Sequence, residues 1–263
     1  MRPPPVGPAA LIDLLAPTLR ICVPVYTASR VSPRAPTARL VGVMPGGKRS
    51  DRISQRDLEV LEFIARFGVV PRHAVATWAG TGRTVTIVRE RRLREAGLIV
   101  VRPAFGGSER LLLCTRAGLR ASGCEELRTA RPSPGAIRHE STVALLAAVL
   151  ERSGERLLSE REILARERAE GKRLLSAALS SGRFHRADLV RVDERGEPGD
   201  AIEVELSTKG AARLDELLRA WRLAVAECRV TRVVYHCAPH TLPFVEQAIE
   251  RTRTAAAVAV EEL

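Results

Sequence analysis

The side chains best suited to chemistry in this 263-residue chain are carboxylates on two consecutive segments of its C-terminal half. In Ala201–Leu206, Glu203 and Glu205 alternate with aliphatic residues, so a strand would place both on one face, roughly 7 Å apart. Asp188 stands upstream in an apolar run, and Lys209 follows downstream. If the two segments pair as a hairpin, Asp188 lies beside Glu203.

Carboxylates that converge in this way suit Mg²⁺, which takes oxygen ligands together with waters and substrate phosphate. A nearby lysine such as Lys209 would orient an attacking water or stabilise charge that develops on a phosphate. The alternative interpretation is that Glu203 and Glu205 form the solvent-facing side of a half-buried sheet, as alternating strands commonly do. For His139 and His185 we favour surface or hydrogen-bonding roles over catalysis.

The second signal is an uneven distribution of charge. The net charge is +11; residues 1–120 hold 20 basic and 8 acidic side chains, whereas residues 138–263 hold 20 and 21. The excess of positive charge in the first half indicates a polyanionic partner, and nucleic acid is the commonest one. Residues 1–50 contain 9 of the 16 prolines and show no sustained period, which predicts a flexible tail.

The pattern after residue 50 predicts three helices followed by two strands. The expected elements are helices over 54–68, 71–78 and 83–96, strands over 98–102 and 110–114 joined by a glycine-rich turn at 105–108, and a further helix from 115. This order is that of a winged helix-turn-helix, and the segment Leu93–Ile99 with the turn after it resembles the recognition helix and wing of that fold.

A helical wheel of the third helix places Val85, Val88, Leu93 and Ala96 on its inward side. The wheel leaves Ile87 exposed and puts Arg89 and Arg92 near the apolar side. The arginines that we expect to contact DNA point away from the core or flank the turn; they are Arg83, Arg91, Arg94, Arg102 and Arg110. The alternative is a winged helix that contacts only proteins.

The segment 123–135 is the expected domain boundary, because it combines prolines, glycines and mixed charge. Beyond it we expect helices over 137–152, 211–228 and 242–252 and strands over 157–163, 186–192, 201–206, 230–237 and 256–260, with 164–182 unassigned. The resulting order αβββαβ, together with Asp188 and Glu203, resembles the PD-(D/E)XK nuclease fold. Ala187 stands in place of the motif's proline and Glu205 in place of its lysine. The resemblance makes Glu140 a third Mg²⁺ ligand beside Asp188 and Glu203.

Four segments together resemble the replication-relaxation family, found on bacterial plasmids and integrated mobile elements. They are His139–Leu146, Leu158–Ile163, Phe184–Val190 and Ile202–Lys209, and the resemblance covers about residues 52–240. It implies DNA binding connected with plasmid replication, relaxation or mobilisation, without establishing nuclease activity.

The sequence thus predicts a two-domain α+β or α/β protein: a proline-rich tail over 1–50, a winged helix-turn-helix over 51–122 and a restriction-endonuclease-like domain over 136–263. The expected function is DNA binding for a mobile element, with Mg²⁺-dependent nicking by Asp188, Glu203, Glu205 and Lys209. The alternative is a non-enzymatic regulator with a degenerate nuclease-like domain for dimerisation or partner binding. Expected partners are double-stranded DNA, a second copy, and replication or transfer proteins.

Two further features bear on location. No apolar stretch reaches the roughly 18–20 residues that span a bilayer. The five cysteines form no CxxC pair, which argues against a disulfide framework. We therefore expect a reduced, cytoplasmic protein without a membrane partner.

Overall fold

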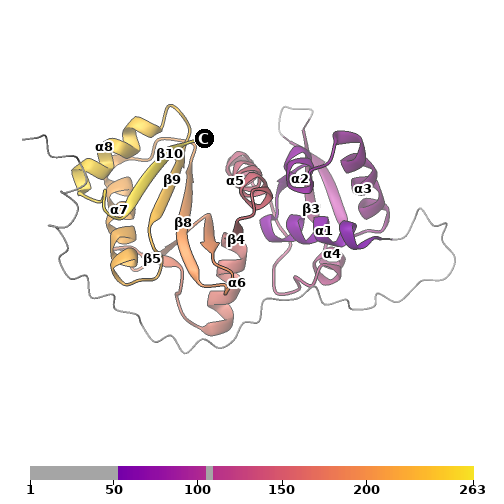
Figure 1. Cartoon of the computed structure of the whole chain (residues 1–263), viewed down its shortest axis with the longest axis horizontal. Helices are drawn as coiled ribbons and strands as arrows, with labels where there is room; N and C mark the ends of the chain where they lie inside the picture. The colour runs from indigo at the N-terminus through magenta and orange to yellow at the C-terminus, as the bar shows by residue number, and fades with distance from the viewer. Residues whose placement is uncertain (1–52, 105–108) are drawn as a thin grey trace, which may run out of the picture. The chain divides into compact units, whose positions relative to one another are not determined.

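The computed structural model describes residues 53–104 and 109–263 (Figure 1). Within these ranges the chain has a mixed α+β fold of eight helices and ten strands in three sheets. The predicted tail over 1–50 and the predicted turn at 105–108 lie outside the described residues. Among the described residues, no helix has the length and apolar character needed to cross a membrane.

The first half of the described chain contains four helices and a three-stranded antiparallel sheet of order β1-β3-β2. Its elements are α1 (Gln55–Phe67), β1 (Val70–Pro71), α2 (Arg72–Ala79), α3 (Arg83–Glu95), β2 (Ile99–Pro103), β3 (Arg110–Cys114) and α4 (Arg116–Ala121). The predicted helices and strands are confirmed to within a few residues. The short β1, which pairs with the middle of β3, was not predicted.

Local sequence signals explain these boundaries. The Ser54 hydroxyl accepts a hydrogen bond from the Asp57 N–H, while the Ser54 N–H donates to the Asp57 carboxylate, so that a capping box starts α1. After α3, Gly97 adopts a φ of 70°, a conformation that favours glycine and lets the chain turn into β2. Gly118 in α4 lies against the carbonyl oxygen of Leu98, where a β-carbon would come within 2.1 Å of it.

The second half is built on a five-stranded mixed sheet of order β10-β9-β8-β7-β4. The neighbours β4, β7 and β8 pair antiparallel, and β8, β9 and β10 pair parallel. The elements are α5 (Pro134–Arg152), β4 (Arg156–Ser159), α6 (Glu160–Glu170), β5 (Ser176–Ala178), β6 (Phe184–Arg186), β7 (Leu189–Val192), β8 (Pro198–Glu205), α7 (Ala211–Ala226), β9 (Val233–Cys237), α8 (Leu242–Thr252) and β10 (Val258–Glu262).

Two predicted strands of this half were wrong in extent. The strand expected over 157–163 ends at Ser159, because Ser159 and Glu162 form a second capping box that starts α6. The strand expected over 186–192 is interrupted, since β6 ends at Arg186 and the chain bends at Asp188 before β7. The unassigned segment 164–182 contains the rest of α6 and β5, which pairs with β6.

Alternation along β8 places different side chains on the two faces of the large sheet. Ile202 and Val204 belong to a buried apolar cluster that also contains Ala144 of α5. Ala201 belongs to a second cluster with Trp221 of α7. The helix α5 therefore covers one face of the sheet and α7 covers the other.

Candidate functional site

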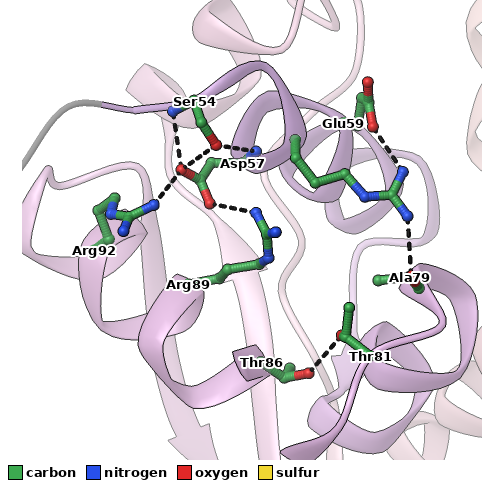
Figure 2. Close-up of polar contacts among 9 residues, drawn as sticks. Ser54, Asp57, Glu59, Ala79, Thr81, Thr86, Arg89 and Arg92 are labelled. Carbon is green, nitrogen blue, oxygen red and sulfur yellow. Dashed lines mark hydrogen bonds and ion pairs between the residues drawn. The ribbon is translucent and has the colours of Figure 1, made fainter. Parts of the chain in front are cut away.

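Helix α3 is fixed to α1 by a buried carboxylate. Asp57 is fully buried in α1 and accepts hydrogen bonds from Arg89 at 2.9 Å and from Arg92 at 2.7 Å (Figure 2). Burial raises the pKa of Asp57, but the hydrogen bonds from Ser54 and Arg92 and the charge of Arg92 outweigh it and lower the pKa below its ordinary value. Two of the arginines of α3 therefore form ion pairs within the protein.

The inward side of α3 is polar. Its buried residues are Thr86, Glu90 and Leu93. Glu90 accepts hydrogen bonds from Arg72 of α2 at 2.5 and 3.0 Å, and the hydroxyl of Thr86 lies 3.3 Å from that of Thr81 (Figure 2). These partners satisfy the buried polar groups, which would otherwise be costly to remove from water.

This arrangement corrects the predicted wheel of α3. Of the four residues expected to face inward, only Leu93 does so; Val85 is 45% exposed and Val88 42%, and Ala96 is exposed. The expected outward position of Ile87, which is 39% exposed, is confirmed. The physical reason is that the ion pairs to Asp57 and Arg72, together with the burial of Leu93, set the rotation of the helix.

The five arginines predicted to contact DNA are all exposed. Arg83, Arg91 and Arg94 stand on the outward side of α3, and Arg102 and Arg110 lie toward the ends of β2 and β3 next to their connection. Arg91 makes only a long ion pair with Glu95, at 3.9 Å. Within 53–104 and 109–263, the other four form no ion pair. This part of the molecule therefore presents cations that are available to an anionic partner.

The carboxylate of Asp188 lies at the point where β7 and β8 begin to separate. The two strands pair with Leu189 opposite Ile202, so Asp188 and Glu203 occupy the next positions. One carboxylate oxygen of Asp188 accepts a hydrogen bond from the backbone N–H of Val204 at 2.7 Å, and the other lies 2.8 Å from Nε2 of His139 on α5. The hydrogen bond with Asp188 raises the pKa of His139.

Glu203 is held by the second histidine. Its two carboxylate oxygens lie 2.9 and 3.0 Å from Nε2 of His185 on β6, and Tyr235 stands opposite it on β9. Burial raises the pKa of Glu203 despite the nearby charge of His185. Glu203 and Glu205 are both only 4% exposed, so the alternative interpretation of a solvent-facing row was wrong. His139 and His185 both form hydrogen bonds, with Asp188 and Glu203 respectively.

Lys209 forms an ion pair with Glu205. Its positive charge also acts on Glu203, where it offsets part of the rise in pKa that burial causes. The structure therefore brings the predicted catalytic residues into one neighbourhood in two groups, Asp188 with Glu203 and Glu205 with Lys209.

A pocket of about 200 Å³ opens beside Asp188. The pocket is lined by both basic and acidic side chains. They are Arg66, Arg128, Arg131, His139, Glu140, Glu160, Arg161 and Asp188. Burial raises the pKa of Glu140 and of Glu160, and the charge of Asp188 adds to the rise at Glu160. Glu160 was not among the predicted site residues, because the strand expected over 157–163 included it. The Ser159–Glu162 capping box is the signal that identifies Glu160 as the first residue of a helix.

Within the described residues, no three His, Cys, Asp or Glu side chains are grouped as a set that could hold a metal ion. The carboxylates of Asp188, Glu203 and Glu140 offer the oxygen donors that Mg²⁺ takes. The oxygens of Asp188 and Glu203 are, however, bonded to histidines and to the backbone. Oxygen donors of the kind that Mg²⁺ takes are therefore present, but in this structure they are engaged in these contacts.

Neither the family models nor the curated proteins with which the chain was compared match it.

Proposed function

We propose that the chain is a double-stranded-DNA-binding protein whose residues 51–122 form a winged helix-turn-helix, with α3 as the recognition helix and β2 and β3 as the wing. One observation carries the proposal. Arg89 and Arg92 hold α3 from inside through Asp57, while Arg83, Arg91 and Arg94 are left exposed on its outer side. A helix that separates its cations in this way is anchored and still presents charge to phosphates and base edges.

Salt dependence of binding tests this proposal. Each phosphate neutralised by an arginine releases counterions, so the affinity for a duplex should fall steeply as salt rises. We expect the double variant Arg91→Ala with Arg94→Ala to bind more weakly and with a shallower salt slope. The matched control is Arg219→Ala with Arg222→Ala, because these arginines have the same spacing and are exposed on α7.

Fluorescence anisotropy with a labelled duplex at several salt concentrations gives both quantities. The proposal fails if the parent protein does not bind duplex DNA in a salt-dependent manner, or if the α3 variant and the α7 control lose affinity equally.

We also propose that residues 136–263 form a restriction-endonuclease-like domain. Leaving out α6, β5 and β6, the elements α5, β4, β7, β8, α7 and β9 follow the order αβββαβ. Asp188 immediately precedes the second of these strands, and Glu203 lies in the third. These features support the nuclease-like fold of this domain. The proposal includes the resemblance of the sequence to the replication-relaxation family and a role on plasmids or other mobile elements.

Mg²⁺-dependent nicking of DNA is the second candidate function, favoured by the adjacent positions of Asp188, just before β7, and Glu203, within β8. Asp188, Glu203 and Glu140 would hold the ion. Bound Mg²⁺ would supply charge stabilisation to the phosphate and lower the pKa of a water molecule. The arginines that line the pocket beside Asp188 would attract the DNA backbone.

A different observation favours the non-enzymatic alternative. The carboxylates of Asp188 and Glu203 are already paired with histidines, and Lys209 is paired with Glu205. A nicking assay on supercoiled plasmid, with and without Mg²⁺ or Mn²⁺, separates the two functions. Nicking that needs the metal and is lost in Asp188→Asn and in Glu203→Gln supports the enzyme. Intact plasmid with every metal, from a protein that still binds DNA, supports the regulator.

A further inference from the structure

The outward side of α3 is unusual because it exposes aliphatic side chains among its arginines. Val85, Ile87 and Val88 are each exposed by 39% or more, while the inward side of the same helix buries Thr86 and Glu90. β-Branched residues gain little from a helical position in contact with water. Exposed aliphatic residues opposite buried polar ones indicate that Val85, Ile87 and Val88 contact a partner.

Two of the three exposed aliphatic residues share one stripe of α3, and Val85 lies beside it. Thr84, Ile87, Val88 and Arg91 follow the i, i+3, i+4, i+7 pattern, which places them on a single helix face. Arg83 and Arg94 border this stripe. An apolar patch on the first two turns of a helix, with arginines along one side and at its C-terminal end, is complementary to the floor of the major groove, where thymine presents a methyl group between phosphate-lined walls.

We infer that α3 recognises thymine 5-methyl groups in duplex DNA through Ile87, Val88 and Val85, with Arg83, Arg91 and Arg94 contacting phosphates or guanines beside them. The inference rests on the proposed DNA binding and names what the helix recognises. A second copy of the chain fits the patch less well. Symmetry would set the arginines of the two helices against each other, and three side chains cover far less than the roughly 1,000 Å² of a specific interface.

Uracil in place of thymine provides a direct test, because the two bases differ only by the methyl group. Duplexes selected by the protein from a random pool would be synthesised with thymine or with uracil and titrated at fixed salt. We expect uracil to weaken binding by about fourfold for each methyl group contacted. Val85→Thr with Val88→Thr, which keeps shape and replaces one methyl group of each side chain by a hydroxyl, should lower the thymine-to-uracil affinity ratio to the part that Ile87 contributes, without changing the salt slope.

Val149→Thr is the matched control, since Val149 is 50% exposed on α5, and it should leave the ratio unchanged. Equal affinity of the parent protein for thymine and uracil duplexes would overturn the inference and leave the proposed DNA binding intact. Absence of salt-dependent binding to either duplex would overturn the proposed function itself. Dimers that dissociate in the double valine variant, with an unchanged thymine-to-uracil ratio, would assign the patch to a second copy instead.

Discussion

Arg89 of α3 and Asp57 of α1 form an ion pair at 2.9 Å around a carboxylate that has no exposed surface. Asp57 therefore has two structural roles, because its carboxylate also completes the capping box that starts α1. A single buried carboxylate therefore sets both the beginning of the first helix and the rotation of the third. The outward direction of Arg91 and Arg94 depends on that rotation.

Asp57→Asn should destabilise the protein strongly. The amide keeps the size of the side chain but removes the charge that compensates Arg89 and Arg92, and it cannot accept every hydrogen bond that the carboxylate accepts. Loss of a buried charged partner costs about 3 kcal/mol of unfolding free energy. Urea denaturation followed by circular dichroism measures this loss.

Glu59→Gln is the control for that variant, because Glu59 also pairs with an arginine of α1, Arg56, but on the surface. An exposed pair contributes at most about 1 kcal/mol. Equal losses in the two variants would show that the buried carboxylate does not hold α3 in place.

The stabilising effect of Asp57 should disappear in acid. Its pKa in the folded protein lies below the ordinary value of 3.8, so the unfolded chain binds the proton first as the pH falls. The contribution of Asp57 is therefore complete above pH 3.8 and is lost as the pH falls through the lower folded pKa. The difference in unfolding free energy between the parent protein and Asp57→Asn should be constant near neutral pH and should shrink below pH 4; a difference that instead grows in acid would contradict the assignment.

The helices and strands around α3 could be predicted because their signals are local. Ser54 and Gly97 mark a start and a stop that depend only on neighbouring residues. The rotation of α3 could not be predicted, since the partners that bury Glu90 and Arg89 lie on other helices. Apolar periodicity assumes that the buried side is the apolar one, and in α3 long-range ion pairs override it.

The burial and the long-range contacts of the candidate site could likewise not be predicted from the sequence. The alternation around Glu203 predicted that Glu203 and Glu205 share a face, and pairing with β7 was confirmed. Nothing in the alternation distinguishes a solvent-facing face from one that α7 covers, and Glu203 is buried. The pairing of His139 with Asp188 joins residues 49 positions apart, so only the tertiary fold could bring it about.

Gly118→Ala and Gly135→Ala should change stability in opposite directions. A β-carbon at Gly118 would meet the Leu98 carbonyl oxygen at 2.1 Å, which is backbone and cannot rotate away. We expect a loss of about 3 kcal/mol from overpacking. At Gly135, in the first turn of α5, no atom lies within 4 Å of the added carbon, so alanine should add up to about 1 kcal/mol through its helix propensity. Thermal or chemical denaturation of the two variants compares them directly, and a neutral Gly118→Ala would contradict the close approach of α4 to Leu98.

Binding of Mg²⁺ to the carboxylates beside β7 and β8 should raise the thermal stability of the protein, whether or not it cleaves DNA. An ion that binds only the folded state adds about 2.7 kcal/mol when its concentration is 100 times the Kd, which corresponds to a rise of roughly 5–10 °C in Tm for a chain of this size. Calorimetry with MgCl₂ against KCl of equal ionic strength isolates the specific effect from screening. Asp188→Asn should abolish the rise, because it removes a negatively charged oxygen ligand of the ion. Glu246→Gln, which removes an exposed carboxylate from α8, should retain the rise. An equal rise in all three proteins would indicate general binding of cations to the surface and would remove the support for Mg²⁺ at Asp188.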